Sequence, residues 1–284
     1  MTETLFSHET AIRLGFFFGI LAVMALWEIL APRRGLSRSK AVRWTANLGI
    51  VALNTVLLRL IFPATAVGLA ALAAERGWGL LSAIALPYEL AVLCSVVLLD
   101  FAIYLQHVLF HAVPVLWRLH RMHHADQDFD VTTGARFHPI EIVLSMVLKL
   151  AVVVALGPPV LGVLIFEVLL NGTAMFNHAN ARLPLGADRV LRLLVVTPDM
   201  HRVHHSVTPE EANSNFGFNL PWWDRLLGTY RAQPAQGHEA MTIGIDQFRE
   251  AADQQLHNML VQPFRSGAGD YAINRRDWKR DEGR

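Results

Sequence analysis

Long apolar stretches constrain the fold of this chain more than any other feature. Four of them run over residues 11–30, 45–74, 80–113 and 140–176. A helix that crosses a bilayer takes about 20 residues, so each stretch is long enough to span a membrane. A large soluble protein with buried helices is the alternative, and stretches of this length disfavour it. We therefore expect an integral membrane protein.

The composition and the helix-breaking residues refine that expectation. Hydrophobic residues make up 53% of the chain and charged residues 17%, whereas soluble proteins average about 45–50% and 25%. The fourth stretch is interrupted by Gly157-Pro158-Pro159 and is long enough for two helices folded into a hairpin. The sequence thus predicts an all-α membrane bundle of about four spans, or of three spans plus a membrane hairpin.

The basic residues predict how the bundle is oriented. Five cations crowd the link between the first two apolar stretches: Arg33, Arg34, Arg38, Lys40 and Arg43. The positive-inside rule places this link in the cytoplasm. If the fourth stretch is a hairpin, counting the spans onward brings the histidine-rich segments to the cytoplasmic face. An odd number of spans between 140 and 176 would break this arrangement.

Histidines form the second strong pattern. The string His-Arg-Met-His-His at 120–124 returns as His-Arg-Val-His-His at 201–205, and His107 and His111 precede the first copy. Positions i, i+3 and i+4 share one face of a helix, so each copy is predicted to aim three imidazoles at a common point. Eight clustered histidines exceed what one tetrahedral zinc needs, which indicates two metals.

Three further residues are candidates beside those eight. His178 follows the predicted hairpin on the same membrane face, and we expect it to be a ligand. His138 precedes an apolar run and is a candidate ligand or outer hydrogen-bond partner. Asp100, two helical turns before His107, is predicted either to accept the free ring N–H of a ligand histidine or to cap at the membrane boundary. The remaining histidines, His8, His238 and His257, are predicted to lie on the surface.

Other patterns exclude several classes of site. Asp126, Asp128 and Asp130 have the spacing of a calcium loop, but Val131 and Phe137 stand where that loop needs glycine and glutamate, so we expect a solvated loop. Cys94 is the only cysteine, which excludes intrachain disulfides and thiolate clusters. The net charge of +1 does not indicate nucleic-acid binding.

The ligand chemistry narrows the function. Neutral imidazoles suit zinc, copper, iron and nickel. A zinc hydrolase typically uses three protein ligands, a water and a glutamate base, yet no His-Glu-x-x-His motif occurs. Two redox-active metals that activate O₂ fit so many imidazoles better, and an apolar substrate would explain a site at a membrane face. A zinc-binding membrane protein with a hydrolytic or structural role stays an alternative, as does a silent lipid-binding scaffold.

The histidine boxes, with Asn177-His178 between them, resemble the fatty acid hydroxylase and sterol desaturase superfamily of membrane di-iron oxygenases. The resemblance covers about residues 90–230. It includes the segments 131–141 and 197–206, similar to bacterial members, and the closing strings Asn213-Ser214-Asn215-Phe216-Gly217 and 223–230. It implies nine metal ligands: His107, His111, His120, His123, His124, His178, His201, His204 and His205. Some members have a further ligand where this chain has Ala174, and His138 or solvent is the candidate replacement.

The resemblance also implies a function and its partners. We expect two iron ions, O₂ as co-substrate, and electrons from NAD(P)H delivered by a separate redox protein. The expected reaction is hydroxylation or desaturation of a fatty acyl or sterol-like lipid at the inner membrane of a bacterium, on its cytoplasmic side. The substrate is expected to lie among Phe101, Phe110, Leu144 and Phe166, and Asp224 and Arg225 are expected to be structural.

We also expect the chain to divide into three parts. Membrane spans are expected over 1–79, and a histidine-box catalytic domain with membrane helices and a cytosolic helical cap over 80–230. A polar tail is expected over 231–284, ending in a highly charged segment from Asn274 that we expect to be solvated or disordered.

Overall fold

A computed structural model describes residues 2–84, 86–265, 267, 269 and 271–274, with side chains from residue 8 onward. Every regular element among these residues is a helix, and two isolated bridges pair Pro32 with Ala181 and Ser206 with Ile243. The predicted all-α class is confirmed. The charged segment 275–284 lies outside the described residues.

The helices follow one another along the chain as α1 (Thr2–Leu30), α2 (Lys40–Ile61), α3 (Ala66–Arg76), α4 (Leu80–Ala83), α5 (Tyr88–Ala112), α6 (Pro114–His124), α7 (Pro139–Leu156), α8 (Val160–Asn177), α9 (Leu185–Leu191), α10 (Pro198–His204), α11 (Pro209–Ala212), α12 (Trp222–Leu226), α13 (Gly237–Ala240) and α14 (Leu256–Val261). Three 3-10 turns join them: η1 (Thr133–Ala135), η2 (Ala251–Gln254) and η3 (Gln262–Phe264).

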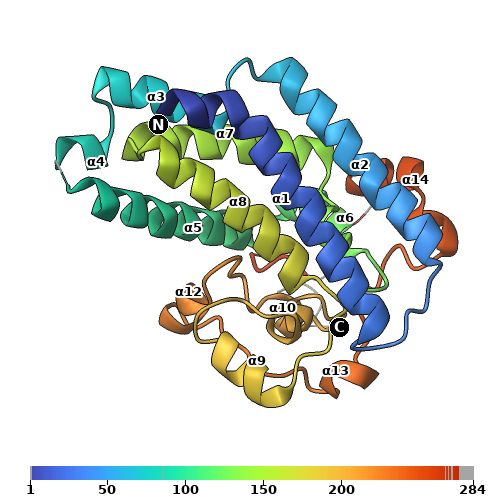
Figure 1. Cartoon of the computed structure of the whole chain (residues 1–284). Coiled ribbons are helices and arrows are strands. Elements are labelled where there is room, and N and C mark those ends of the chain that lie inside the picture. Colours follow the sequence, from blue (N-terminus) through green and yellow to red (C-terminus); the bar gives the residue numbers. More distant parts are fainter. Residues whose placement is uncertain (1, 85, 266, 268, 270, 275–284) are drawn as a thin grey trace.

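Five helical segments are long and apolar enough to cross a membrane: His8–Leu30, Lys40–Ala83, Tyr88–Ala112, Pro139–Leu156 and Val160–Asn177. The first, third, fourth and fifth correspond to α1, α5, α7 and α8, and Figure 1 shows these long helices gathered on one side of the molecule. The second is longer than the sequence pattern suggested, because it joins α2 to α3 and α4 through short bends.

The predicted hairpin in the fourth apolar stretch is confirmed. Helix α7 ends at Gly157, which adopts the left-handed conformation with φ 58°, and α8 begins three residues later. A Cβ at Gly157 would lie 1.9 Å from the carbonyl oxygen of Trp78. Glycine is therefore required twice over, for its backbone angle and for the close approach of another segment.

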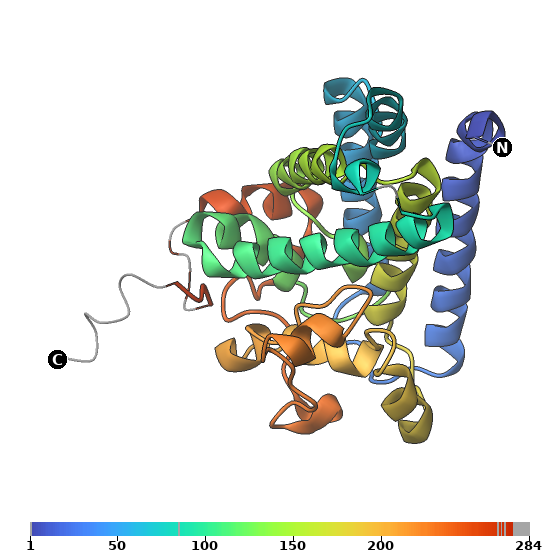
Figure 2. The same ribbon diagram turned by 90° about the vertical axis from the view of Figure 1, so that its left-hand side faces the viewer.

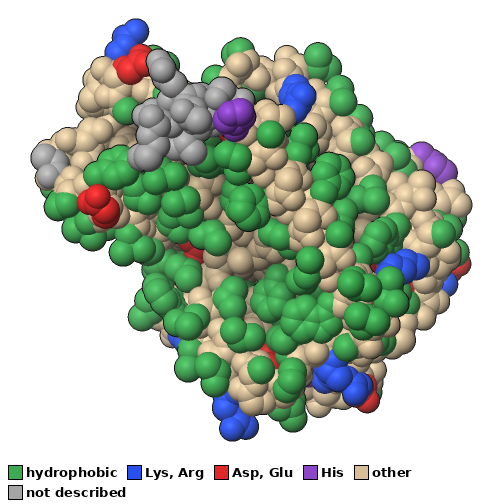
Figure 3. All heavy atoms as spheres, in the orientation of Figure 1, with side chains coloured by type: hydrophobic (Ala, Val, Ile, Leu, Met, Phe, Trp, Pro, Cys, Tyr) green, Lys and Arg blue, Asp and Glu red, His purple; other side chains and the backbone are tan. Residues whose placement is uncertain are grey.

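The long helices share one apolar core and present a second apolar surface outward. Val153, Val163 and Phe166 from the hairpin pack with Leu99 of α5 and with Ala70 of α3. Many other large apolar side chains on the same helices remain exposed, and Figure 3 shows hydrophobic side chains across much of this face. Outward-facing apolar side chains on helices of this length are those that a bilayer would solvate.

Helices α9 to α13 form a helical cap at one end of the long helices. Figure 2 shows α9 to α13 as a separate layer, whereas α14 lies against the side of the bundle. Met259 of α14 packs with Ala46 and Ile50 of α2 and with Met122 of α6. The expected helical cap is therefore present, and the tail from residue 231 onward contributes to it.

The acidic segment after α6 contradicts the predicted solvated loop. Asp126 and Asp130 are fully buried, and both accept hydrogen bonds from Arg43 of α2, which is itself 0% exposed. Asp128 accepts from the backbone N–H groups of Ser37 and Arg38. Buried charges persist when they are paired. These contacts fix the link between the first two spans, and the start of α2, to the segment that follows α6.

Candidate metal centre

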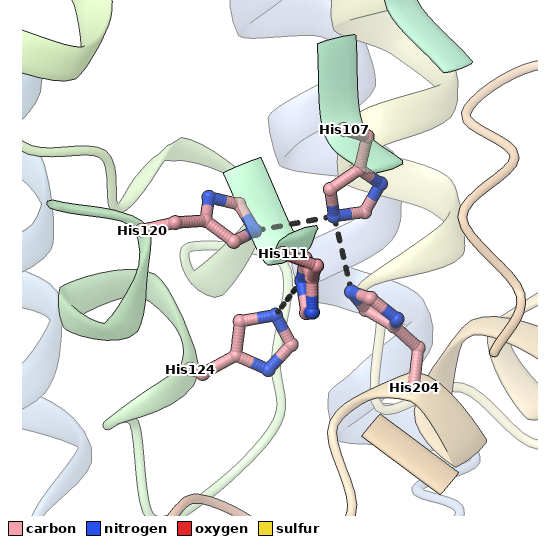
Figure 4. A group of neighbouring side chains, drawn as sticks. All are labelled: His107, His111, His120, His124 and His204. Carbon is pink, nitrogen blue, oxygen red and sulfur yellow. Dashed lines mark hydrogen bonds between the residues drawn. The ribbon is translucent and has the colours of Figure 1, made fainter. Parts of the chain in front are cut away.

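Nine buried histidines converge in two neighbouring groups between the long helices and the cap. The first group comprises His107, His111, His120, His124 and His204, which Figure 4 shows facing one another. The second group comprises His123, His178, His201 and His205. Within each group the nitrogens nearest the centre all lie within 4.8 Å of one another. The structure thus brings together the nine histidines that the sequence singled out.

We expected each copy of the doubled motif to aim its three rings at one point, and this prediction was wrong. Helix α6 sends His120 and His124 to the first group and His123 to the second. Helix α10 and the residue after it send one ring, His204, to the first group and two rings, His201 and His205, to the second. At 100° per residue, positions i and i+4 lie about 40° apart, whereas i+3 lies about 100° from i+4. Each copy therefore serves both groups.

Spacing within the groups matches the edges of a metal coordination sphere. Nε2 of His107 lies 3.1 Å from Nε2 of His120 and 3.0 Å from Nε2 of His204. In the second group, Nε2 of His178 lies 3.1 Å from that of His201 and 3.3 Å from that of His123. Neighbouring ligands of an octahedral ion with bonds of about 2.1 Å would stand about 3.0 Å apart.

The outer ring nitrogens decide where the protons are in the first group. Nδ1 of His107 donates to the carbonyl oxygen of Phe216 at 2.8 Å, and Nδ1 of His204 donates to that of Ser214 at 2.7 Å. A neutral imidazole with its proton on Nδ1 presents a lone pair on Nε2. Two such lone pairs only 3.0 Å apart repel each other unless a cation lies between them. The donor set therefore fits a metal ion.

Two more rings of the first group are oriented by side chains. Nδ1 of His120 lies 2.6 Å from Oε1 of Glu141, at the start of α7, and Nδ1 of His111 lies 3.1 Å from Oδ1 of Asn213. Carboxylates and amides in these positions fix the tautomer and orientation of a ligand histidine.

The second group has fewer such supports. His178 Nδ1 donates to the carbonyl oxygen of Ala174 at 2.8 Å. The Nδ1 atoms of His123, His201 and His205 are buried without a hydrogen-bond partner, and so is Nε2 of His205. Buried polar atoms of this kind normally have a partner, and a ring whose two nitrogens both lack one fits a residue that binds a metal.

Burial keeps these rings neutral. It lowers the pKa of His120 and the pKa of His178 to about 3. Burial, together with the neighbouring histidines, also holds the pKa values of His124, His204 and His205 well below the ordinary 6.5. Neutral imidazole is the form that binds a metal, so the rings need lose no proton near neutral pH.

Two roles were predicted for Asp100, and the structure does not show the first of them, a hydrogen bond with a ligand histidine. Its carboxylate accepts hydrogen bonds from the backbone N–H groups of Asn219 and Leu220 and, at 2.7 Å, from the indole of Trp223. It contacts no ligand histidine directly. It fixes the segment just after Phe216, whose carbonyl oxygen accepts from His107.

The expected structural role of Asp224 is confirmed. This fully buried carboxylate accepts from the backbone N–H groups of Phe216 and Gly217 at 2.8 Å each and from the hydroxyl of Thr229. Arg225 donates to the carbonyl oxygen of Arg192 and covers the ring of Tyr230. Both residues fix the loop beneath the first group without entering it.

His138 lies outside both groups. Its Nδ1 caps α7 by accepting from the N–H of Ile140, and its Nε2 lies 3.2 Å from the carbonyl oxygen of Leu260. Both nitrogens are thus engaged elsewhere, so His138 is no replacement for the ligand missing at Ala174. Three residues later stands Glu141, which sequence reasoning missed. An acidic residue in the first turn of an apolar helix was the available signal.

The three unclustered histidines divide differently from our expectation. His8 and His257 are exposed, as predicted. His238 is 6% exposed, and its Nε2 lies 3.6 Å from Asp199 at the start of α10. Burial lowers its pKa to about 4. The prediction that His238 lies on the surface was wrong.

A cavity of about 320 Å³ opens beside the first group. His107, His120 and Glu141 line its inner end, and the walls are mostly apolar. Among the residues expected to surround a substrate, only Phe110 lines this cavity. Phe101 packs instead on Trp223, Phe166 is buried in the helical core and Leu144 is 37% exposed.

The part of the chain that contains the nine histidines is similar to known proteins. Residues 92–229 match the sequence model of the family described as fatty acid hydroxylase. Ornithine lipid hydroxylase OlsE of Rhizobium tropici is 33% identical over 148 residues, covering 52% of this chain and 44% of that protein. Alkylglycerol monooxygenase of Homo sapiens is 28% identical over 162 residues, covering 57% and 35%.

A third relative, cholesterol 25-hydroxylase of Rattus norvegicus, is 27% identical over 145 residues, covering 50% of this chain and 47% of that protein. The matched part of the chain therefore spans less than half the length of these relatives. No solved structure shows a significant match.

Proposed function

We propose that this chain, whose residues 92–229 match the fatty acid hydroxylase family, is a member of that family. We further propose that the protein is a membrane oxidoreductase that hydroxylates or desaturates a lipid. The matched region contains the whole constellation of nine histidines. The named relatives are lipid hydroxylases and monooxygenases, and this supports a lipid C–H position as the point of attack.

One observation supports the metal above all others. His107 and His204 each commit their Nδ1 proton to a backbone carbonyl oxygen, and their Nε2 lone pairs then face each other at 3.0 Å. We propose that the first group holds one iron ion and the second group another. The ions, when bound, would supply the redox chemistry by which O₂ attacks an unactivated C–H bond.

The chain's own residues have three tasks in this proposal. The carbonyl oxygens of Phe216 and Ser214 and the carboxylate of Glu141 fix the tautomers of three ligand rings. The apolar walls beside His107 and His120 admit an alkyl chain and exclude water. The buried floor around Asp224 fixes the loop from which the two carbonyl oxygens project.

Partners and location belong to the same proposal. The five membrane-length helices support insertion in a bilayer, and similarity to a bacterial ornithine lipid hydroxylase favours a bacterial inner membrane. The cations from Arg33 to Arg43 favour the cytoplasmic side for the cap and its histidines. Electrons would come from NAD(P)H through a separate redox protein.

Metal analysis tests the proposal. We expect detergent-purified protein from iron-supplemented cells to contain about two irons per chain, and a His204→Ala, His205→Ala double variant to lose them, since each residue belongs to a different group. Iron-loaded protein given an electron donor should consume O₂ when a lipid is added. No metal after iron supplementation would refute the di-iron centre.

Zinc is the outcome that favours the alternative. Full zinc occupancy that survives iron supplementation, together with no lipid-dependent O₂ consumption, would indicate a zinc-binding membrane protein with a hydrolytic or structural role. Bound iron with no O₂ consumption toward any lipid would instead indicate a silent relative.

A further inference from the structure

The cavity beside the first histidine group has polar groups at both ends. At its inner end, Glu141 Oε2 and Asn54 Oδ1 are buried acceptors without a hydrogen-bond partner. Elsewhere the lining includes two cations, Arg13 of α1 and Lys149 of α7, together with Asn171 of α8. Apolar side chains such as Phe17, Ile103 and Met146 make up much of the rest of the wall.

The two cations belong to an ion-pair cluster between three long helices. Lys149 Nζ lies 3.0 Å from Oε1 of Glu167, and Arg13 Nη1 lies 2.9 Å from Oε2 of the same carboxylate. The side chain of Glu167 is 2% exposed, and Arg13 also pairs with Glu9 at 3.0 Å. All four residues lie inside or beside apolar helices of membrane-spanning length. Ionisable residues in such segments are costly, and this cost is normally accepted for a function.

The cluster turns its positive side toward the cavity. Arg13 and Lys149 line the cavity, whereas Glu9 and Glu167 do not. The ammonium group of Lys149 has three donors and uses one on Glu167. The guanidinium of Arg13 has five donors, and its ion pairs with Glu9 and Glu167 engage only Nη1 among the side chains that the structure describes. Glu167 therefore fixes two cations whose remaining donors are available to a ligand.

The position of the cluster gives the ligand a length. Lys149 lies eight residues after Glu141 on α7, which corresponds to about 12 Å of helix. Glu141 in turn contacts His120 of the first group. A ligand that reaches from the cations to the histidines needs an apolar segment of roughly that length, and a cavity of about 320 Å³ holds one chain rather than a whole two-chain lipid.

We propose that Arg13 and Lys149 form a binding subsite for the acceptor oxygens of an acyl group, a carboxylate or an ester or amide carbonyl. The alkyl chain attached to that group extends to His107 and His120. The inference rests on the proposed function and adds a substrate class to it: an acyl lipid held by its oxygenated end. Because the distance from subsite to histidines is fixed, the subsite would also determine which carbon is oxidised.

Binding of radiolabelled palmitic acid to the detergent-purified full chain tests this subsite and needs no bound iron. Each of two variants removes one cation and leaves no fully buried charge unpaired: Arg13→Gln, which leaves Glu167 paired with Lys149, and the double variant Lys149→Met, Glu167→Gln, which leaves Arg13 paired with Glu9. Arg59→Gln is the matched control, because Arg59 is an exposed cation on α2 that does not line the cavity. Circular dichroism would verify that all variants fold.

We expect both cavity variants to bind palmitic acid at least about tenfold more weakly, the loss typical of a hydrogen bond to a charged group, and the control to bind it as the unmodified chain does. Hexadecane should compete weakly and equally in all proteins. If methyl palmitate competes as well as the acid, a carbonyl oxygen suffices. If only the acid competes, the subsite selects a carboxylate. Either result supports the subsite.

Three outcomes would overturn it: no binding of palmitic acid, unchanged affinity in both folded cavity variants, or hexadecane competing as well as palmitic acid. The proposed function is tested separately. Lipid oxidation by the iron-loaded protein, combined with unchanged palmitic acid binding in the variants, would leave that function standing without this subsite. The expected binding pattern without lipid oxidation would leave the subsite standing alone.

Discussion

The two histidine groups differ in what orients their rings. In the first group, four of the five rings have a hydrogen-bond partner at Nδ1: His107, His111, His120 and His204. In the second group only His178 has one. The first group also borders the cavity, through His107 and His120, whereas no ring of the second lines it. The better-supported group is the one nearest the proposed substrate.

This difference indicates which ligand rings the fold itself holds in position. A ring fixed by an outer hydrogen bond is in place before an ion arrives, so the first group is preorganised. The second group relies on helix placement. Its helix α10 is anchored at its back, where Asp199 pairs with Arg202 and with Arg33 and lies 3.6 Å from His238.

The largest expected effect follows from removing one ligand of each group in turn. His107→Ala and His201→Ala should each lower lipid oxidation by more than about a hundredfold, beyond the loss caused by an outer partner, because both ions serve one reaction. Iron per chain should fall by about one in each variant. His257→Ala, an exposed histidine outside both groups, is the control. Full activity in either ligand variant would contradict a joint centre.

A substitution at Glu141 tests the outer hydrogen bond that orients His120 in the first group. Glu141→Gln weakens the charge-assisted bond to His120 Nδ1 and should reduce iron affinity or activity by about 10- to 100-fold. Iron content and turnover are the measurements. A loss of the second-group ion alone would contradict the assignment of Glu141 to the first group.

A substitution at Gly134 tests the hydrogen bond that orients His178 in the second group. A Cβ there would lie 2.5 Å from the carbonyl oxygen of Ala174 and 3.1 Å from Nδ1 of His178, the two atoms that form the outer bond of this group. Gly134→Ala should lower iron occupancy to between one and two per chain and reduce activity by about tenfold, by disturbing that single outer bond. The matched control is Gly186→Ala, because a Cβ at Gly186 meets nothing within 4 Å. Equal effects of the two substitutions would refute the prediction.

The smallest effect concerns the anchor of α10 and acid pH. The pKa of His238 is lowered to about 4, so this residue stabilises the fold fully above the unfolded value of about 6.5. That contribution is lost as the pH falls from 6.5 through 4, because the unfolded chain takes up the proton first. In metal-free protein, we expect the midpoint of thermal unfolding to fall between pH 7 and pH 5. This fall should be a few degrees smaller in His238→Gln than in the unmodified chain. An identical drop in both would contradict the role.

Local patterns in the sequence were sufficient for part of the fold. The break at Gly157-Pro158-Pro159 and the lengths of the apolar stretches predicted the hairpin and the membrane-length helices. The boxes and Asn177-His178 identified every histidine that the structure brings together. These signals are local, because helical spacing and ligand type are properties of a few consecutive residues.

Contacts between distant segments could not be predicted in the same way. Asp126 and Asp130 appeared as a solvated loop because Arg43, their counterpart in the fold, lies more than eighty residues earlier in the chain. Asp100 was expected either to contact a nearby ligand histidine or to cap at the membrane boundary, whereas its partner Trp223 is 123 residues away. The spacing of the doubled motif also misled us, because positions i+3 and i+4 diverge around the helix far enough to reach separate histidine groups.

The way α6 and α10 divide their histidines has a consequence for how the protein is made. Neither group is complete until both helices are in position, and α10 leaves the ribosome more than seventy residues after α6. A nascent chain that ends before α10 carries only six of the nine rings, none of them in a finished site. If the proposed ions bind here, their insertion would therefore come after translation of the cap and its docking, and the newly made protein would have to wait in the membrane for them.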